Sequence, residues 1–361
     1  MLGILATDEY DSHELALFVR EHRNNHSKPL ITVGMGAHGQ LSRAVAPISF
    51  VTHDLVPFSA APGQLTLSQI HQTMHLIGQI PKRNFFIFGN NIAHSLSPAL
   101  HNTAFKELGL PHHYSIYETI EVDANVRDIM AQPDFGGASV TFPHKLQIGK
   151  FLHSESTVAK LIGAVNTVLV HYSKDGSKQL VGDNTDWLGI KSCIEVNWNG
   201  PVVDTQSAVV IGAGGASRAA CYALQQLGVK KLYLINRTRR KAEELEKDFP
   251  ALQFVHYASY SGVPQKFDPV PRAIVACVPA DDFVEEDIPV ALFNGAEHGV
   301  LVEMAYRPLV TALMKVGRRF RGWKVTRGVD VLKEQAYHQF SMWTGRRAPA
   351  SVMAAAVDAR C

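Results

Sequence analysis

A glycine-rich turn separates a buried apolar stretch from a helical stretch in the second half of the chain. Residues 208–211 read AVVI, and the turn follows as Gly212-Ala213-Gly214-Gly215-Ala216-Ser217. Strand, glycine turn and helix N-terminus in this order form a phosphate site, because missing side chains let backbone N–H groups approach a pyrophosphate at the positive helix end. We therefore predict a dinucleotide-binding unit. The alternative is a tight turn whose small residues serve packing, and Ser217 replaces the third glycine of the usual pattern.

The next strand pattern ends at Asn236, where an NAD-specific site usually carries an acidic residue. The chain continues instead as Asn236-Arg237-Thr238-Arg239-Arg240-Lys241. Cations and small donors suit a 2′-phosphate, and the planar fork of arginine suits it best. The pattern favours NADP over NAD. The alternative is a solvated first turn of a helix over residues 238–249, although cations at a helix N-terminus are mildly unfavourable.

Strand and helix patterns alternate along the chain and form three blocks, which we expect over residues 1–80, 84–200 and 205–330. Such alternation predicts an α/β protein, and the third block has the pattern of a doubly wound parallel sheet. The first block starts abruptly at Met1. Its expected elements are a helix over 14–22, strands over 28–36 and 48–57, and a helix ending near Gly78.

In the later blocks we expect a helix with Ser97 as its N-cap and Pro98 at its first position, strands at 163–172 and 179–187, and a final helix from Val331 to about Trp343. Pro98 at the start of the first of these helices and Gly109 after it are typical boundary signals.

Composition excludes several classes of protein. The 361 residues are 46% apolar and 19% charged, as in a globular protein of two or three domains. The net charge of 35 − 33 = +2 gives no reason to expect nucleic-acid or membrane binding. The four cysteines, Cys193, Cys221, Cys277 and Cys361, lack metal-ligand spacing. We therefore expect no metal site and a reducing, cytoplasmic location, with neither a signal peptide nor a membrane span.

Polar residues follow the strand patterns of the second block. They are Ser95, Ser97, Thr141, Lys145, Asn166, Thr167, Asn184, Thr185 and Asp186. At the carboxyl edge of a sheet they could line a pocket for a small polyhydroxylated ligand. Hydride transfer to a ketone also needs a proton donor, which Lys145 paired with Asp186 could supply. Individually, each such residue is more often a turn residue or a surface charge, but their joint occurrence beside a nucleotide-binding pattern favours a site.

Residues 85–361 resemble the shikimate dehydrogenase family over essentially its whole length. The resemblance rests on SLSPALHN, GGASVTFPHK, IGAVNT, GDNTDW, GAGGASR, NRT and EQAYHQFSMWTG, in the family's order and spacing. It implies a two-domain fold with a C-terminal Rossmann domain at 205–330. It also implies a substrate-binding domain at 84–200, completed by a C-terminal helical segment at 331–361.

The resemblance also implies roles for individual residues. Ser95 and Ser97 would hold the substrate carboxylate, and Thr141, Asn166 and Gln335 would contact ring hydroxyls. Lys145 and Asp186 would be the catalytic pair. The pyrophosphate loop would be Gly212, Gly214, Gly215, Ala216 and Ser217, and the NADP-selecting turn would be Asn236, Arg237, Thr238 and Lys241.

Two positions depart from the family pattern. Ser139, which we keep among the substrate-binding residues, stands where the commonest family form has an Asn, and Glu303 stands where many members have Asp. Both departures bear on substrate affinity rather than on the fold.

Residues 28–66 resemble the C-terminal end of type I dehydroquinate dehydratase, through GMGAHGQLSR, VTHDLVPF and AAPGQL. Arg43 and Gln64 match its substrate-binding positions, while Ala60 stands where a Ser is expected. The Schiff-base lysine and catalytic histidine of that family lie upstream of anything present here. We therefore expect a remnant of a (β/α)8 barrel without dehydratase activity, in which Arg43 and Gln64 are relics.

The first functional hypothesis is NADP-dependent, reversible reduction of 3-dehydroshikimate to shikimate, with quinate as a possible further substrate. The second is a catalytically weak or inactive quinate-pathway repressor that senses such ligands with the same fold. Retention of Lys145, Asp186, Asn166 and Gln335 favours the enzyme, whereas Ser139 and the partial barrel favour the sensor. A dehydratase end joined to a dehydrogenase also predicts a larger multidomain context, as in the pentafunctional shikimate-pathway polypeptide.

Overall fold

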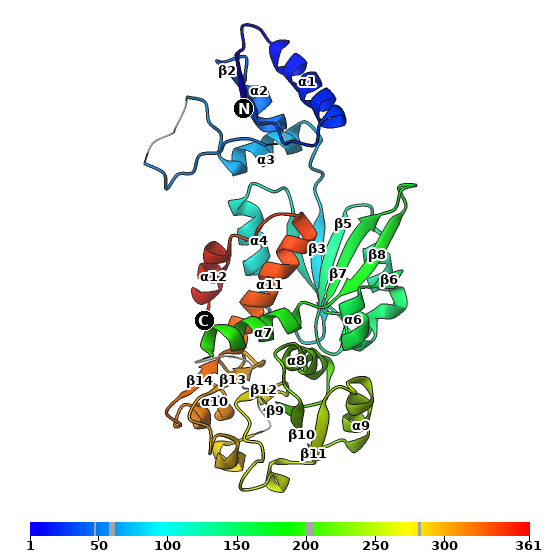
Figure 1. The fold of residues 1–361 in the computed structure, drawn as a ribbon. Coiled ribbons are helices and arrows are strands. Elements are labelled where there is room, and N and C mark those ends of the chain that lie inside the picture. Colours follow the sequence, from blue (N-terminus) through cyan, green and yellow to red (C-terminus); the bar gives the residue numbers. More distant parts are fainter. Residues whose placement is uncertain (47, 58–61, 199–205, 281–282) are drawn as a thin grey trace. The chain divides into compact units, whose positions relative to one another are not determined.

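The chain divides into two compact units (Figure 1). The first comprises Met1–Asn84 and Asn102–His113, and the second comprises Phe85–His101 and Tyr114–Cys361. The computed structural model describes residues 1–46, 48–57, 62–198, 206–280 and 283–361. The predicted departure at Ala60 and the predicted boundary between residues 200 and 205 lie outside the described residues.

The first unit contains a two-stranded parallel sheet, β1–β2, in which Leu2 lies opposite Thr32. Its elements are β1 (Leu2–Leu5), α1 (Asp11–Asn25), β2 (Thr32–Met35), α2 (Gln40–Val45) and α3 (Leu67–Leu76). Helix α1 buries Leu15 and Val19, which stand four residues apart on one helix face. The α1 helix is longer than the predicted 14–22, and the sequence patterns did not identify β1.

The predicted strand over residues 48–57 is wrong. The stretch forms only an isolated bridge between Thr52 and Thr66. Its apolar side chains stay exposed, with Phe50 at 55% and Leu55 at 88%. An apolar run becomes a strand only when a neighbouring strand edge and a covering layer are available, and the described part of this unit provides neither for this run.

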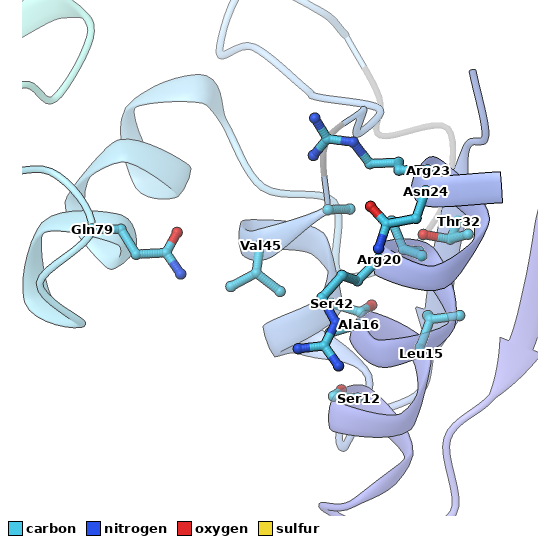
Figure 2. A pocket seen from close by; sticks show the side chains of 12 residues that line it. Ser12, Leu15, Ala16, Arg20, Arg23, Asn24, Thr32, Ser42, Val45 and Gln79 are labelled. Carbon is cyan, nitrogen blue, oxygen red and sulfur yellow. The ribbon is translucent and has the colours of Figure 1, made fainter. Parts of the chain in front are cut away.

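The first unit also contains a cavity of about 430 Å³. Helix α1 provides much of its lining, including Ser12, Leu15 and Arg20, while Gln79 approaches from another side (Figure 2). None of the residues predicted for catalysis, substrate or cofactor binding lines it.

The second unit contains two six-stranded sheets. One has the order β11-β10-β9-β12-β13-β14 with parallel neighbours throughout, which confirms the predicted Rossmann fold class. Its elements are β9 (Ser207–Ile211), α8 (Gly215–Gln226), β10 (Lys231–Ile235), α9 (Arg239–Asp248), β11 (Gln253–Tyr257), β12 (Ala273–Ala276), β13 (Gly299–Glu303), α10 (Ala312–Gly317) and β14 (Trp323–Thr326).

Strand β9 lies at the centre of this sheet and all five of its residues are buried. Ala208 and Val210 join an apolar cluster with α7, α8 and α9, whereas Val209 and Ile211 join the cluster on the other face. This division follows the alternation of side chains along a strand. Each buried Val or Ile contributes about 1.5–3 kcal/mol to stability, so the continuous apolar pattern of 208–211 reflects burial on both faces.

The other sheet is mixed, with the order β4-β3-β5-β7-β8-β6 and antiparallel pairing of β7 with both β5 and β8. Its strands are β3 (Asn84–Gly89), β4 (His113–Glu118), β5 (Phe135–Val140), β6 (Ser154–Glu155), β7 (Thr167–Tyr172) and β8 (Lys178–Asp183). The accompanying helices are α4 (Ser97–Glu107), α5 (Ala124–Ala131), α6 (Thr157–Ile162), α7 (Asp186–Asn197), α11 (Gly328–Thr344) and α12 (Ala350–Asp358). Helix α11 packs against α7 and contacts β5 and β7 (Figure 1).

The predicted strand over 179–187 is partly wrong, because β8 ends at Asp183 and Asp186 begins α7. The Asn184 side chain accepts a hydrogen bond from the Asp186 N–H at 3.0 Å. This local turn competes with continued strand pairing and brings Asp186 to a helix N-terminus. In the part of the chain that the structure describes, no helix is long and apolar enough to cross a membrane.

Candidate active site

One cavity of about 120 Å³ in the second unit collects all eight residues predicted for catalysis or substrate binding. They are Ser95, Ser97, Ser139, Thr141, Lys145, Asn166, Asp186 and Gln335. They come from strands, helices and loops, and they span 241 positions of sequence, from residue 95 to residue 335 inclusive. The geometry therefore creates one polar pocket from residues that the sequence only suggests separately.

Lys145 and Asp186 form a direct ion pair inside this pocket. The Lys145 Nζ lies 2.5 Å from Asp186 Oδ2, and the two side chains are 15% and 7% exposed. Asp186 begins α7, where the positive helix end stabilises a carboxylate. Lys145 lies on a short helical turn, His144–Leu146, whose main chain is held by a bond from Val165 N to Lys145 O at 2.9 Å. The arrangement places an ammonium donor at a defined position in a mostly buried cavity.

The Asn166 side chain holds the other oxygen of this carboxylate. Its Nδ2 donates to Asp186 Oδ1 at 2.9 Å and also faces Thr185 and Gln335. Its Oδ1 accepts from the Thr185 N–H and from the Thr167 hydroxyl, both at 2.7 Å. Because amide and hydroxyl partners are all buried, the Asn166 side chain has one well-satisfied orientation.

Hydroxyl groups occupy the start of α4 at the same pocket. The Ser97 N–H donates to Ser95 Oγ at 3.3 Å, and Ser97 is buried at the first residue of the helix. Tyr306 also lines this pocket, and burial raises the pKa of its hydroxyl.

The lining residues that sequence reasoning missed include Met304, Tyr306 and Gln339. Gln339 stands four residues after Gln335 on α11, a spacing that puts both on one helix face. That spacing could have identified Gln339. Met304 and Tyr306 follow the carboxyl end of β13, the usual ligand edge of a parallel sheet.

Glu303, one of the two departures from the family pattern, is buried at the end of β13. Its carboxylate accepts from Ala305 N at 3.0 Å and from Thr311 Oγ1 at 2.8 Å. Burial raises the pKa of Glu303 to about 7, against the opposing effect of these two hydrogen bonds. The residue does not line the pocket, but it holds the chain that carries Met304 and Tyr306 into it.

The glycine turn at α8 leaves open space next to the ion pair. Gly212 has φ +104°, a conformation that favours glycine, whereas a Cβ at Gly214 would meet no atom within 4 Å. A Cβ at Gly215 would lie 3.1 Å from the Lys145 Cβ. Ser217 Oγ accepts from Gly214 N at 3.2 Å, so it stabilises the turn from inside. The open position at Gly214 fits a diphosphate at the N-terminus of this 12-residue helix.

The cations after β10 fall into two groups. Arg239 pairs with Glu243 at 2.8 Å and Arg240 with Glu244 at 3.5 Å. Arg237 and Lys241 are exposed and take part in none of the ion pairs found within the described residues. The Asn236 side chain donates to Thr238 O at 2.8 Å and braces the turn. The two uncommitted cations are the two that were predicted to select NADP.

A Rossmann sheet whose open glycine turn touches a buried lysine–carboxylate pair defines a two-domain, dinucleotide-dependent oxidoreductase. Family comparisons make the class specific. Residues 87–168 match the shikimate dehydrogenase substrate binding domain, 197–279 match shikimate / quinate 5-dehydrogenase, and 328–357 match the shikimate 5′-dehydrogenase C-terminal domain. The chain belongs to the shikimate dehydrogenase family.

Solved structures agree with this assignment. A shikimate 5-dehydrogenase from Thermus thermophilus, in complex with NADP(H) and shikimate, is 30% identical with a TM-score of 0.64, and the match covers 77% of this chain and all of that one. The dehydroquinate dehydratase and shikimate dehydrogenase part of S. pombe AroM is 39% identical with a TM-score of 0.81. That match covers 99% of this chain and 68% of the other.

The N-terminal region matches a second family. Residues 2–81 match type I 3-dehydroquinase, which confirms the predicted dehydratase-like segment. Arg43 is buried in α2 and donates to Pro62 O at 3.1 Å, and Gln64 is half-buried. The pentafunctional AROM polypeptide of Malassezia globosa is 42% identical over 94% of this chain. The chain spans about a fifth of the length of such relatives, 21% in this case.

Proposed function

We propose that this chain catalyses the NADP-dependent, reversible reduction of 3-dehydroshikimate to shikimate. The observation that carries the proposal is the contact of Lys145 with Asp186 in a hydroxyl-lined pocket directly beside Gly215 of the nucleotide turn. A proton donor and a nucleotide turn must be neighbours for hydride and proton to reach one carbonyl group.

Bound NADPH supplies the hydride. Lys145 donates a proton to the substrate oxygen as negative charge develops there, and a positioned ammonium stabilises that charge more in the transition state than in the ground state. Asp186 holds the ammonium in place through its Oδ2, while Asn166 holds Oδ1. In the reverse direction the same lysine accepts the hydroxyl proton.

The remaining site residues receive binding roles in this proposal. Ser95 and Ser97 bind the substrate carboxylate, and Ser139, Thr141, Asn166 and Gln335 bind ring hydroxyls. The backbone of Gly212, Gly214, Gly215, Ala216 and Ser217 binds the pyrophosphate. Asn236 and Thr238 shape the turn, while Arg237 and Lys241 bind the 2′-phosphate with charges that no described ion pair engages.

The proposed domain division follows these roles. Residues 84–200 with 331–361 bind substrate, residues 205–330 bind NADP, and residues 1–80 are the end of a dehydratase barrel. Two parallel strands cannot close an eight-stranded barrel, so no dehydratase reaction is assigned to this segment. Membership of a larger multidomain polypeptide, in a cytoplasmic location, completes the proposal.

The test is nicotinamide absorbance with purified full chain, NADP and shikimate, followed by quinate and by NAD in place of NADP. Shikimate oxidation with NADP is the expected result. Binding of shikimate or quinate by calorimetry without any turnover would overturn the enzymatic proposal and support the ligand-sensing one.

A further inference from the structure

A continuous chain of six buried polar side chains ends at the Asp186 carboxylate. Its members, in hydrogen-bonded order from the Tyr114 end to the Asp186 end, are Tyr114, Ser139, Gln339, Thr167, Asn166 and Asp186. Each is at most 6% exposed. Buried polar groups depend on each other for hydrogen bonds, because an unmade bond costs the full desolvation of the group. A change at one member therefore affects its neighbours.

The Tyr114 end of this hydrogen-bonded series sets the orientation of the Gln339 amide. The Tyr114 hydroxyl donates to Ser139 Oγ at 2.7 Å, and the Ser139 hydroxyl donates to Gln339 Oε1 at 3.0 Å. On the opposite side, Gln339 Nε2 lies 3.2 Å from the main-chain oxygen of Asn166. A carbonyl oxygen can only accept, so the reversed amide would place two acceptors together. One orientation is therefore strongly preferred.

The hydrogen bonds from Gln339 to Asp186 then orient Thr167, Asn166 and Asp186 in sequence. Gln339 Nε2 donates to Thr167 Oγ1 at 2.9 Å, which leaves the Thr167 hydroxyl to donate to Asn166 Oδ1 at 2.7 Å. The Thr167 hydroxyl and the Thr185 N–H both donate to Asn166 Oδ1, so Asn166 turns its Nδ2 toward Asp186, where it donates to Oδ1 at 2.9 Å. Asp186 Oδ2 is left for the Lys145 ammonium.

We propose that Gln339 is a positioning residue for the Lys145–Asp186 pair. It directs the Thr167 hydroxyl, through it the Asn166 amide, and through that amide the Asp186 carboxylate. Helix α11, far along the chain from β7 and α7, thereby sets the geometry of the reacting groups. This inference rests on the proposed function where it is tested by kcat, but its test by NMR does not depend on that function.

The first test is a double-mutant cycle in the full chain with Gln339→Met, which keeps the length without the amide, and Thr167→Val, which keeps the shape without the hydroxyl. Each single variant should lower kcat about tenfold, as for loss of roughly one hydrogen bond, with KM for NADP unchanged. If Gln339 acts through Thr167, the double variant should lose no more than the worse single variant. Multiplied losses would overturn the proposal. Gln226→Met, at an exposed position on α8, is the matched control and should leave kcat unchanged.

The second test uses NMR and needs no turnover. The Asn166 side-chain amide protons, assigned by their loss in Asn166→Asp, should exchange slowly in the wild type. They should exchange at least about tenfold faster in Gln339→Glu, whose carboxylate keeps the shape but cannot donate to Thr167. Unchanged exchange in that folded variant would overturn the proposal. A wild type without turnover would refute the proposed reaction, while this exchange measurement would still decide the role of Gln339.

Discussion

Two glycine turns follow parallel strands in this chain, and their absent side chains make room for different things. After β2, a Cβ at Gly39 would lie 2.3 Å from the carbonyl carbon of Gly34, so glycine is required there by the chain's own packing. After β9, a Cβ at Gly214 would meet nothing within 4 Å, and the φ of −99° at this position suits any residue. Neither packing nor backbone conformation therefore requires glycine at position 214. The first turn closes on itself, whereas the second leaves a space that a ligand can occupy.

The strands before these turns differ in the same way. All five residues of β9 are buried in a six-stranded sheet covered on both faces. Within the described residues, β1 and β2 pair only with each other, and Leu5 is 68% exposed. Parallel strands are normally covered on both faces. The strand–glycine–helix pattern thus occurs in both units, but of these two turns only the one after β9 combines open space with a six-stranded supporting sheet.

The largest expected effect is on kcat, and it distinguishes the site in the second unit from the cavity in the first unit. Lys145→Ala should lower kcat at least about a hundredfold, the low end of general acid–base contributions, with NADP binding retained. Arg20→Ala in the cavity of the first unit should leave kcat unchanged, because that cavity contains none of the reacting groups. Steady-state kinetics checks both variants. A Lys145→Ala variant that keeps most of its turnover would refute the proton-donor role.

The second effect tests whether the nucleotide turn selects NADP. Arg237→Ala should weaken NADP by about 1.5–3 kcal/mol, as for a lost charged hydrogen bond, and should barely change the KM for NAD. Arg239→Ala is the matched control, since Arg239 is already paired with Glu243. Equal losses for NADP and NAD in Arg237→Ala would contradict the assignment.

The third prediction concerns the replacement of Gly39 and of Gly214, one at a time, by alanine. Gly39→Ala should destabilise the first unit near the upper end of the roughly 1–3 kcal/mol seen for overpacking, because backbone atoms cannot move aside like a side chain. Limited proteolysis should then cut more rapidly before Asn84. Gly214→Ala should change stability by no more than about 0.5 kcal/mol but raise the KM for NADP. A stability loss at Gly214 equal to that at Gly39 would remove the distinction between the turns.

The smallest effect concerns pH. The buried carboxylates among the described residues, Asp186 and Glu303, both lie in the second unit. Burial raises the pKa of Glu303 from 4.5 to about 7, so between these values the folded state holds a proton that the unfolded chain has lost. Stability should therefore fall as pH rises through this window, by at most about 1.4 kcal/mol per pH unit.

Urea unfolding at pH 5 and pH 8, for the wild type and Glu303→Gln, measures this contribution as a difference between the two proteins. The wild type should lose more stability than the variant on going to pH 8. Identical pH dependence in both proteins would show that Glu303 does not titrate in this range.

Local patterns predicted most helices and strands of both units, but they did not show which apolar runs would pair as strands. The run 208–211 became a strand because a six-stranded sheet buries both of its faces, whereas the run 48–57, in which polar residues interrupt the apolar ones, forms only an isolated bridge between Thr52 and Thr66. The strand predicted through residue 187 was overridden by the Asn184 turn, which moved Asp186 onto a helix. Local sequence patterns predict turns well, but they do not show which strand edges are available for pairing.

The sequence by itself determined the residue types of the site: glycines where a strand meets a helix, cations without an acidic residue after β10, and a lysine, an aspartate and amides at strand ends. Their order also marked the family. Only the tertiary structure decided that Lys145 lies 2.5 Å from Asp186 and that the Gln339 amide contacts the main-chain oxygen of Asn166. The reason is physical: these relations join residues from separate strands and helices, and packing of α11 and α7 against the sheets sets their distances.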